Sequence, residues 1–371
     1  MTLNIVILGL SITSSWGNGH ATTYRALVKA LSKRGHSVTF LERDVPWYRQ
    51  NRDLANPDYC RLSLYQSLPE LARHADLVRD ADLVIQGSYV PDGVAIADWL
   101  TGRATGVTAF YDIDTPVTLA GLESGQVDYI SAGLIPRFDL YLSFSGGPAL
   151  GLVEDLYGSP LARSLYCSAD LHMHRTSGAS PSWSLGYLGT YSEDRQPLLE
   201  RLFSEPARRL PGQSFVVAGS QYPHSVEWPA NVRYIAHLPP REHVQFYGAQ
   251  RYALNVTRSD MKALGYSPSV RLFEAAGCGT PVISDNWPGI ETVFEPGKEI
   301  LIAASPRDVV QILTELPDDR RLTIAANARA RLLREHTPAH RACQLEAYYQ
   351  EALARRPSVR ASSIHALEEV K

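Results

Sequence analysis

The chain has 371 residues, no marked excess of charge of either sign and no concentration of cysteine. Its formal net charge of −3 provides no general attraction to nucleic acid or to an anionic membrane, so any anion site must be local. The four cysteines, Cys60, Cys167, Cys278 and Cys343, are widely spaced and include no C-x-x-C pair. This spacing argues against a zinc site or a disulfide framework and favours a reducing cytosol.

Long apolar runs, internal repeats and low-complexity tracts are also absent. The apolar run from Leu3 to Ile12 is too short to span a bilayer and has no basic segment before it. We interpret it as a buried strand and predict a cytoplasmic protein without an integral membrane segment. The last residues, 357–371, are polar and are expected to be mobile.

The first half of the sequence alternates strand patterns with helix patterns. The apolar run 3–12 is typical of a parallel strand covered on both faces, and apolar residues then recur at helical spacing over 24–31 until Gly35. Further strands are expected at 37–41, 82–86, 107–111 and 138–144. This alternation predicts a parallel sheet.

A polar stretch over 175–182 has the composition of a linker, and the pattern restarts after it. Strands are expected at 183–188, 215–218, 232–235, 252–256 and 281–284, with closing helices at 319–334 and 338–355. We predict two doubly wound, Rossmann-like α/β domains, 1–178 and 179–337. Ligands of such sheets bind at the carboxyl ends of the strands, so both domains can face a shared cleft.

A short helix after residue 266 is predicted to bind an anion. Ser267 is a suitable N-cap, Pro268 suits the first helical position, and Gly277 or Gly279 stops the helix. The free backbone N–H groups and the positive dipole end of such a helix suit a diphosphate.

Glu274 follows Ser267 by seven residues, which returns to nearly the same helix face roughly 10 Å further along. That is about the distance from a diphosphate to the ribose that carries it. A carboxylate at this position could accept hydrogen bonds from both ribose hydroxyls. The neighbours of Glu274 are apolar, so we expect it to be buried and to need a partner.

A glycine-containing loop, Gly17-Asn18-Gly19-His20, joins the first strand to the first helix. Glycine allows a close approach to a ligand, and a helix N-terminus favours a neutral imidazole, which a general base needs. The loop and Glu42 also nearly match the dinucleotide fingerprint, which keeps a dehydrogenase alternative open. The third glycine is absent, however, and the loop is long.

Two further groups follow predicted strands, and a third lies at the crossover between the domains. Asp112 and Asp114 could orient His20 or bind an acceptor, although Asp114 also suits a helix cap before Pro116. Gly146 and Gly147 are expected to line the cleft near the acceptor. The pair His172 and His174 has no third metal ligand in view, so we interpret it as structural and predict no metal.

The run Arg271-Leu-Phe-Glu-Ala-Ala-Gly-Cys-Gly-Thr-Pro-Val-Ile-Ser-Asp285 resembles the signature of GT-B glycosyltransferases. The segments 231–239 and 294–302 make the CgeB-like branch, named for a spore maturation protein, the most similar. The resemblance covers most of 183–335 and, more loosely, the N-terminal half. It implies the GT-B architecture, with helix 338–355 packing back on the first domain.

The resemblance also implies roles for residues. Glu274 would bind the donor ribose, while Arg258 and Lys262, with Arg195 as a third candidate, would hold the diphosphate together with the helix start at Ser267. Inverting relatives often place a catalytic His in the loop of His20. Many retaining relatives carry a second Glu where this chain has Tyr266, so a retaining mechanism is in doubt.

We therefore predict a hexosyltransferase that moves a sugar from a nucleoside diphosphate donor, with UDP favoured, to an unknown acceptor hydroxyl. The expected chemistry is metal-independent and uses no cofactor, since His20 deprotonates the acceptor while cations and a helix N-terminus take the leaving diphosphate. A nucleotide-sugar 2-epimerase of the same fold and a non-catalytic binding scaffold are the alternatives, besides the dehydrogenase. No nucleic-acid partner is expected.

Overall fold

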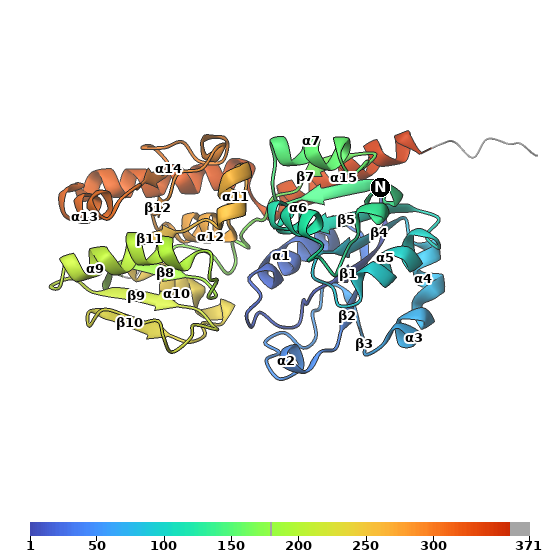
Figure 1. Ribbon diagram of the computed structural model, residues 1–371, viewed down its shortest axis with the longest axis horizontal. Coiled ribbons are helices and arrows are strands. Elements are labelled where there is room, and N and C mark those ends of the chain that lie inside the picture. The colour runs from blue at the N-terminus through green and yellow to red at the C-terminus, as the bar shows by residue number, and fades with distance from the viewer. Residues whose placement is uncertain (179, 357–371) are drawn as a thin grey trace, which may run out of the picture.

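Two parallel sheets, each covered by helices, form two lobes that lie side by side (Figure 1). The computed structural model describes residues 1–178 and 180–356. Residue 179, at the predicted domain boundary, and the tail 357–371, predicted to be mobile, lie outside the described residues. The doubly wound two-domain architecture expected from the sequence is confirmed.

The N-terminal sheet has seven strands in the order β3-β2-β1-β4-β5-β6-β7. These strands are β1 (Asn4–Gly9), β2 (Ser37–Arg43), β3 (Arg61–Tyr65), β4 (Leu83–Gly87), β5 (Val107–Asp112), β6 (Leu140–Ser143) and β7 (Ala162–Ser164). The helices of this lobe are α1 (His20–Lys33), α2 (Pro46–Arg49), α3 (Leu68–Leu71), η1 (Ala72–His74), α4 (Ala75–Asp80), α5 (Gly93–Thr101), α6 (Thr115–Ser124), η2 (Ala132–Arg137) and α7 (Pro148–Asp155). Every residue of β1 after Asn4 is buried, as expected of a central strand with helices on both faces.

The C-terminal sheet has six strands in the order β10-β9-β8-β11-β12-β13. These strands are β8 (Trp183–Leu188), β9 (Phe215–Ala218), β10 (Val232–Ile235), β11 (Gln250–Asn255), β12 (Val282–Ser284) and β13 (Leu301–Ile302). The helices of this lobe are α8 (Gln196–Leu199), η3 (Glu200–Ser204), α9 (Glu205–Arg209), η4 (Pro240–Glu242), α10 (His243–Gly248), α11 (Ser259–Leu264), α12 (Val270–Cys278), η5 (Ile290–Thr292), α13 (Pro306–Glu315) and α14 (Asp318–Glu335). All paired strands run parallel, so their carboxyl ends lie at one edge.

Three strands that the sequence pattern did not predict, β3, β7 and β13, lie at sheet edges. Strand β3 buries only its last residue, Tyr65, and its Leu64 is exposed. Strands β7 and β13 have three and two residues. A short or half-exposed strand leaves little hydrophobic pattern in the sequence, because its register depends on the neighbouring strand.

Helix α15 (Pro338–Arg355) leaves the C-terminal lobe and lies against the N-terminal lobe (Figure 1). It begins at a capping box in which Thr337 and His340 satisfy each other's backbone N–H groups. Arg341 donates from Nε to the carbonyl of Tyr166 at 2.9 Å, and the hydroxyl of Tyr348 donates to the carbonyl of Ser164 at 3.1 Å. Helix α15 thus ties the two lobes together.

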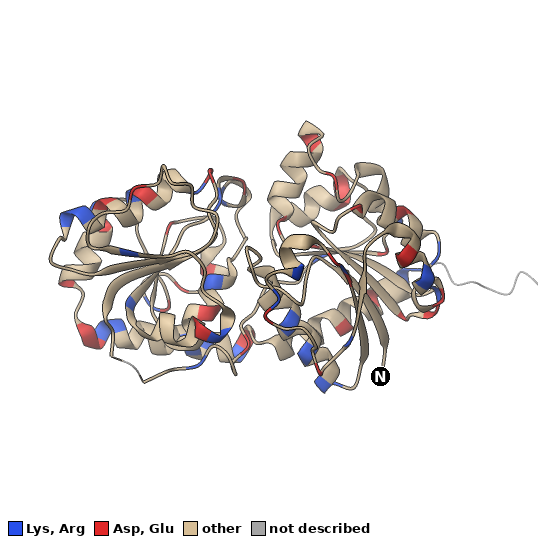
Figure 2. Ribbon diagram, turned by 90° about the horizontal axis from the view of Figure 1, so that it is seen from below, with Lys and Arg blue, Asp and Glu red and all other residues tan. Residues whose placement is uncertain are grey.

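Charges of both signs are interspersed over the ribbon (Figure 2). The four cysteines are all free thiols. Within 1–178 and 180–356, no helix is long and apolar enough to cross a membrane.

From the contact of α15 with the first lobe we predict that the free energy of unfolding of the protein depends on pH. Glu346 accepts two hydrogen bonds from Arg34, at 2.6 and 2.7 Å, and one from Nε2 of His36 at 2.7 Å. These hydrogen bonds, opposed by partial burial, lower the pKa of Glu346 from 4.5 to about 2. Because the folded-state pKa is depressed, the stabilisation is present above the unfolded pKa and is lost as pH falls through the folded value.

We expect Glu346→Gln to lower the free energy of unfolding by about 1–2 kcal/mol at pH 7, because it removes the negative charge from a partly exposed hydrogen-bond acceptor. The difference from wild type should shrink between pH 4.5 and pH 2. Urea denaturation at several pH values measures both quantities. Asp76→Asn is the control, since its side chain is 81% exposed in a surface pair with Arg79. Equal effects of the two substitutions would contradict the prediction.

Candidate active site between the two domains

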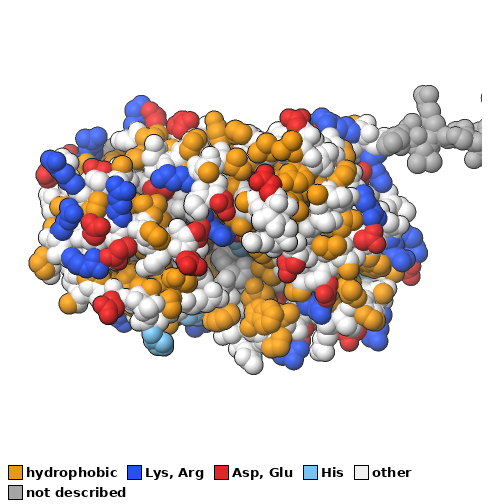
Figure 3. Space-filling view, viewed as in Figure 1, with side chains coloured by type: hydrophobic (Ala, Val, Ile, Leu, Met, Phe, Trp, Pro, Cys, Tyr) orange, Lys and Arg blue, Asp and Glu red, His pale blue; other side chains and the backbone are white. Residues whose placement is uncertain are grey.

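A cavity of about 270 Å³ lies between the lobes, where the carboxyl ends of both sheets meet. Figure 3 shows the hollow between the two lobes on one face of the molecule. The N-terminal lobe lines it with the loops after β1, β5 and β6. The C-terminal lobe lines it with the loops after β8, β9 and β11, with residues before and within α10, and with the start of α12. The shared cleft expected from the sequence is therefore present.

The loop after β1 is anchored from below by Glu42, which is fully buried at the end of β2. Its carboxylate accepts the backbone N–H groups of Ile12 at 2.7 Å and Thr13 at 3.0 Å, and the hydroxyl of Ser11 at 3.0 Å. The dehydrogenase alternative needed this carboxylate for a ribose hydroxyl. Because the carboxylate of Glu42 already accepts hydrogen bonds from the loop, it does not support the dehydrogenase alternative.

A second anchor fixes the tip of the same loop. Asp53 accepts the backbone N–H and the hydroxyl of Ser15 at 3.1 and 2.8 Å, and a two-pronged contact from Arg25 at 3.1 and 2.6 Å. The loop then turns at Gly17, whose φ of 60° favours glycine, and presents residues 17–19 to the cavity.

His20 is the first residue of α1 and lines the cavity. Its ring packs edge-on against Phe144 with a centroid distance of 5.7 Å, and within the described residues its Nδ1 has no hydrogen-bond partner. Burial lowers the pKa of His20, Asp114 opposes this shift, and Arg258 and Arg195 add to it. The imidazole is thus kept neutral, as a general base requires, by burial and by two arginines.

The two aspartates after β5 have different surroundings. Asp112 is fully buried and accepts the hydroxyl of Thr118 at 2.9 Å and the backbone N–H of Asp114 at 3.2 Å. Burial raises the pKa of Asp112 to about 6, against the lowering effect of its hydrogen bonds. Asp112 does not line the cavity, whereas Asp114 does. Asp114 accepts the hydroxyl of Tyr89 at 3.0 Å.

Basic side chains gather on the C-terminal wall of the cavity. Arg258 lies between Asp194, at 3.3 Å, and Asp114 of the other lobe, at 3.5 Å. Arg195 donates to the carbonyl of Thr190 at 2.8 Å and also lines the cavity. Lys262 is not part of the lining: its side chain is 45% exposed and pairs with Asp285 at 3.5 Å. The structure therefore separates Lys262 from the two arginines.

The helix of the C-terminal motif starts two residues later than predicted. The N-cap of α12 is Ser269, whose hydroxyl accepts the backbone N–H of Arg271 at 3.2 Å. Ser267 is wrong as a cap, because its hydroxyl contacts that of Ser145 in the other lobe at 2.6 Å and the carbonyl of Gly265 at 2.9 Å. Gly279, with φ of 75°, ends the helix as one of the two predicted stops. Ser267 and the N-terminus of α12 still line the cavity.

Glu274 on α12 is buried, as predicted, and lines the cavity. One carboxylate oxygen accepts the hydroxyl of Tyr247 at 3.1 Å, and the other faces the hydroxyl of Thr22 in the N-terminal lobe at 3.4 Å. Burial by itself would raise the pKa of Glu274, but His174, His243 and Tyr247 lower it to about 2. Glu274 is therefore ionised at neutral pH.

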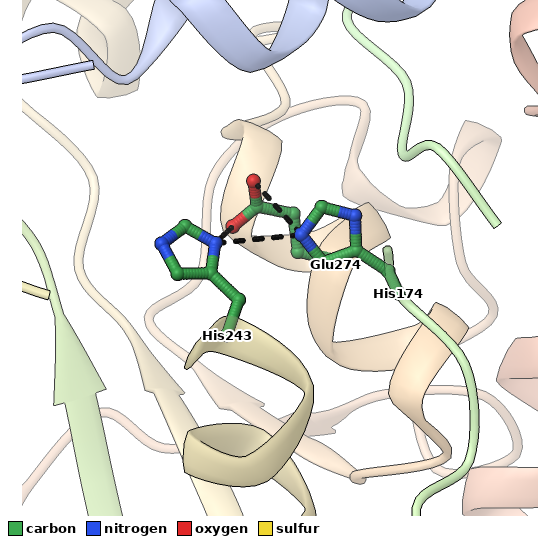
Figure 4. Close-up of side chains that lie close together, drawn as sticks. All are labelled: His174, His243 and Glu274. Carbon is green, nitrogen blue, oxygen red and sulfur yellow. Dashed lines mark hydrogen bonds and ion pairs between the residues drawn. The ribbon is translucent and has the colours of Figure 1, made fainter. Parts of the chain in front are cut away.

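The sequence showed no third metal ligand near His174. In the structure, His174 lies close to two other side chains that could bind a metal. His174, His243 and Glu274 point toward one another from three segments of the chain (Figure 4). All three side chains are buried, and burial lowers the pKa of His174 against the effect of Glu274. His172, two residues away, is exposed and takes no part in this group. The structure thus brings together three side chains of ligand type, which the sequence did not reveal.

Tyr266 does not line the cavity but joins the two lobes beside it. Its carbonyl accepts the backbone N–H of Gly146 at 2.9 Å. A Cβ atom on Gly147 would lie 2.3 Å from its ring and one on Gly289 would lie 2.4 Å from it, so only glycines allow this packing. Gly146 and Gly147 are likewise outside the lining, where Ser145 is the contributing residue of this loop. These three residues form an interdomain contact.

The cavity lining includes residues that were not singled out from the sequence, among them Arg271, His243 and Tyr247. Arg271 is buried, donates to the carbonyl of Leu188 at 2.6 Å and to Asn255 at 2.7 Å, and lies over the ring of Tyr187 at 4.6 Å. Its place three residues before Glu274, on one helix face, was the available signal. His243 and Tyr247 are spaced by one helical turn, but nothing in the sequence directs that face toward Glu274.

Comparison with known proteins supports the same architecture. Residues 195–347 match a family model described as glycosyl transferase-like. None of the curated protein sequences compared with this chain is significantly similar to it.

Solved structures of low sequence identity superpose on nearly the whole chain. Sucrose-phosphate synthase of Thermosynechococcus elongatus has a TM-score of 0.71 at 15% identity, covering 95% of this chain and 99% of that one. HepE of Anabaena, in complex with UDP and glucose, has a TM-score of 0.71 at 14% identity, covering 94% and 99%. The catalytic domain of starch synthase IV of Arabidopsis thaliana, bound to ADP and acarbose, has a TM-score of 0.65 at 12% identity, covering 96% and 100%. The chain therefore has the two-domain GT-B fold of glycosyltransferases.

Proposed function

We propose that this protein transfers a sugar from a nucleoside diphosphate donor to the hydroxyl group of an acceptor. The observation that carries the proposal is the interdomain cavity, where arginines and a helix N-terminus on one lobe face a neutral imidazole on the other. Cations suit a leaving diphosphate and a neutral imidazole suits the removal of a proton. The GT-B fold and the family match over 195–347 support this reading.

The donor is assigned to the C-terminal lobe. Arg195, Arg258 and the start of α12 would take the charge of the diphosphate. Glu274, about one turn further along the helix, would accept hydrogen bonds from the ribose hydroxyls. UDP is the preferred nucleotide, because HepE is similar in fold and was solved with UDP and with UDP-glucose. A hexosyl donor and the CgeB-like branch stay predictions of the sequence motif.

The acceptor is assigned to the N-terminal lobe. His20 would remove the proton of the attacking hydroxyl, and Asp114, which shares the cavity wall, would orient His20 or the acceptor. A single displacement of this kind inverts the anomeric carbon. Incubation with donor alone tests the 2-epimerase alternative, since only that enzyme would form an epimer without an acceptor. A binding scaffold would turn over no nucleotide sugar.

Glu274→Gln tests the donor assignment. The substitution keeps the shape of the side chain but removes its charge, and hydrogen bonds to charged groups contribute about 1.5–3 kcal/mol. We expect UDP to bind at least about tenfold more weakly by calorimetry, with the fold intact by circular dichroism. Glu291→Gln, at an exposed position of the same lobe, should leave the affinity unchanged. Wild-type affinity of the Glu274 variant would refute the ribose contact.

Arg258→Ala tests the diphosphate contact. Uridine lacks the diphosphate charge, so the substitution should weaken UDP by about tenfold or more and uridine by much less. Lys262→Ala is the matched control, because this cation lies on the neighbouring helix outside the cavity lining. Competition binding of UDP and uridine measures both ratios. Equal weakening of the two ligands by Arg258→Ala would point to a folding defect rather than a phosphate contact.

His20→Ala tests the general base. We expect the rate of sugar transfer to fall about 10²–10⁴-fold, since that is the usual contribution of such a group. The affinity for UDP should stay nearly constant, because the nucleotide belongs to the other lobe. Release of UDP from a nucleotide sugar with a panel of acceptors measures turnover. Near-normal turnover would move the role to Asp114, and lost UDP binding would place His20 against the donor.

A further inference from the structure

The group formed by His174, His243 and Glu274 is assembled from three separate segments. His174 lies in the crossover between the lobes, His243 begins α10, and Glu274 lies within α12. In Figure 4 the two rings and the carboxylate converge on one point. The three side chains are buried, yet His243 and Glu274 also line the interdomain cavity. Such convergence of three ligand-type side chains calls for a physical reason.

The distances within the group are too long for a good hydrogen-bond network. Nε2 of His174 lies 3.4 Å from Nδ1 of His243 and 3.5 Å from one Glu274 oxygen, while Nδ1 of His243 lies 3.7 Å from the other. Hydrogen bonds between such atoms are typically about 2.7–3.2 Å long. Donor atoms held roughly 2.0–2.1 Å from a tetrahedral Zn²⁺ stand about 3.3–3.4 Å apart. The two distances from Nε2 of His174 are close to this edge length, and one ligand atom from each of the three residues lies within 4.8 Å of the others, which leaves room for an ion between them.

Groups behind His174 and Glu274 orient these two side chains as outer partners of metal ligands do. Nδ1 of His174 lies 3.2 Å from the carbonyl of Asp170, which can only accept. If Nδ1 carries the proton, Nε2 presents its lone pair to the centre of the group. The hydroxyl of Tyr247 donates to one carboxylate oxygen of Glu274 at 3.1 Å.

The charge of the group also lacks a permanent partner. Across 1–178 and 180–356, Glu274 forms ion pairs with no lysine or arginine, only with the two histidines. A buried carboxylate without a cation is costly, because burial removes its hydration. A divalent cation between the three side chains would supply the missing positive charge.

We propose that His174, His243 and Glu274 hold a divalent transition-metal ion of the Zn²⁺ type, with a fourth position open to the cavity. Two imidazoles and one carboxylate form a ligand set that Zn²⁺ favours, and three protein ligands leave room for water or substrate. This site goes beyond the proposed transferase activity. It is compatible with ribose binding, since each carboxylate oxygen of Glu274 has two lone pairs and can accept a hydroxyl besides contacting the ion.

The test uses the full chain, without nucleotide, stripped by a chelator and titrated with ZnCl₂ alone. We expect one Zn²⁺ per chain by calorimetry and by elemental analysis after gel filtration. Co²⁺ in its place should give the intense visible absorption of a four-coordinate ion. His174→Gln and His243→Gln should each weaken Zn²⁺ by more than about 100-fold, because losing even an outer partner typically costs 10–100-fold.

His172→Gln is the matched control, because this exposed histidine lies on the same segment as His174 and belongs outside the group. It should bind Zn²⁺ as the wild type does. Thermal denaturation of all variants in the presence of chelator shows whether each variant folds without metal. If one of the two ligand variants does not fold, the other still tests the site.

Sub-stoichiometric Zn²⁺, or equal affinity in the control and both ligand variants, would overturn the site and leave a histidine–carboxylate contact. Because no nucleotide is present, this failure is distinct from a failure of sugar transfer. Zn²⁺ binding without binding of UDP, ADP or GDP would refute the proposed transferase and leave the metal site intact.

Discussion

An ionised carboxylate buried at the junction of two domains is the constraint around which this site is arranged. Glu274 is 3% exposed, and its surroundings come from both lobes and from the crossover that joins them. A buried charge is tolerated only if polar groups or a cation compensate it. Thr22, His174, His243 and Tyr247 must therefore stay in place together, which couples the relative position of the lobes to the chemistry of the cavity.

The other wall of the cavity depends on loops that are fixed by acidic side chains. The carboxylates of Glu42 and Asp53 accept hydrogen bonds from the loop after β1, so the backbone of this loop is already ordered where it reaches the cavity. Such preorganisation places His20 at the cavity wall without the entropy cost of ordering the loop on binding. A carboxylate that looks like a ligand group in sequence thus serves the scaffold.

Several contacts beside the cavity limit how far the lobes can separate. The ring of Tyr266 packs between Gly147 of one lobe and Gly289 of the other, Ser145 contacts Ser267, and α15 returns to the first lobe. Arg258 spans the cavity to Asp114. In the proposed donor complex a diphosphate would compete with Asp114 for this arginine, and one charged group would then link donor binding to the interdomain pair.

Local patterns in the sequence determined the buried strands, the long helices, the helix stop at Gly279 and the burial of Glu274, because each depends on residues within a few turns. They did not reveal the edge strands β3, β7 and β13, whose pairing is set by distant neighbours. Ser267 had the right residue type for a cap, but its hydroxyl binds Ser145, which is 122 residues away.

The tertiary structure alone decided which polar groups meet. His174 and His243 are 69 residues apart and reach the same carboxylate, while Lys262 and Tyr266, close in sequence to the site, lie outside its lining. The spacing of residues in the sequence indicates which side chains share a face of one helix or strand. A site, however, is formed where the loops after several strands meet. That convergence depends on the packing of two sheets and a returning helix, which no short segment encodes.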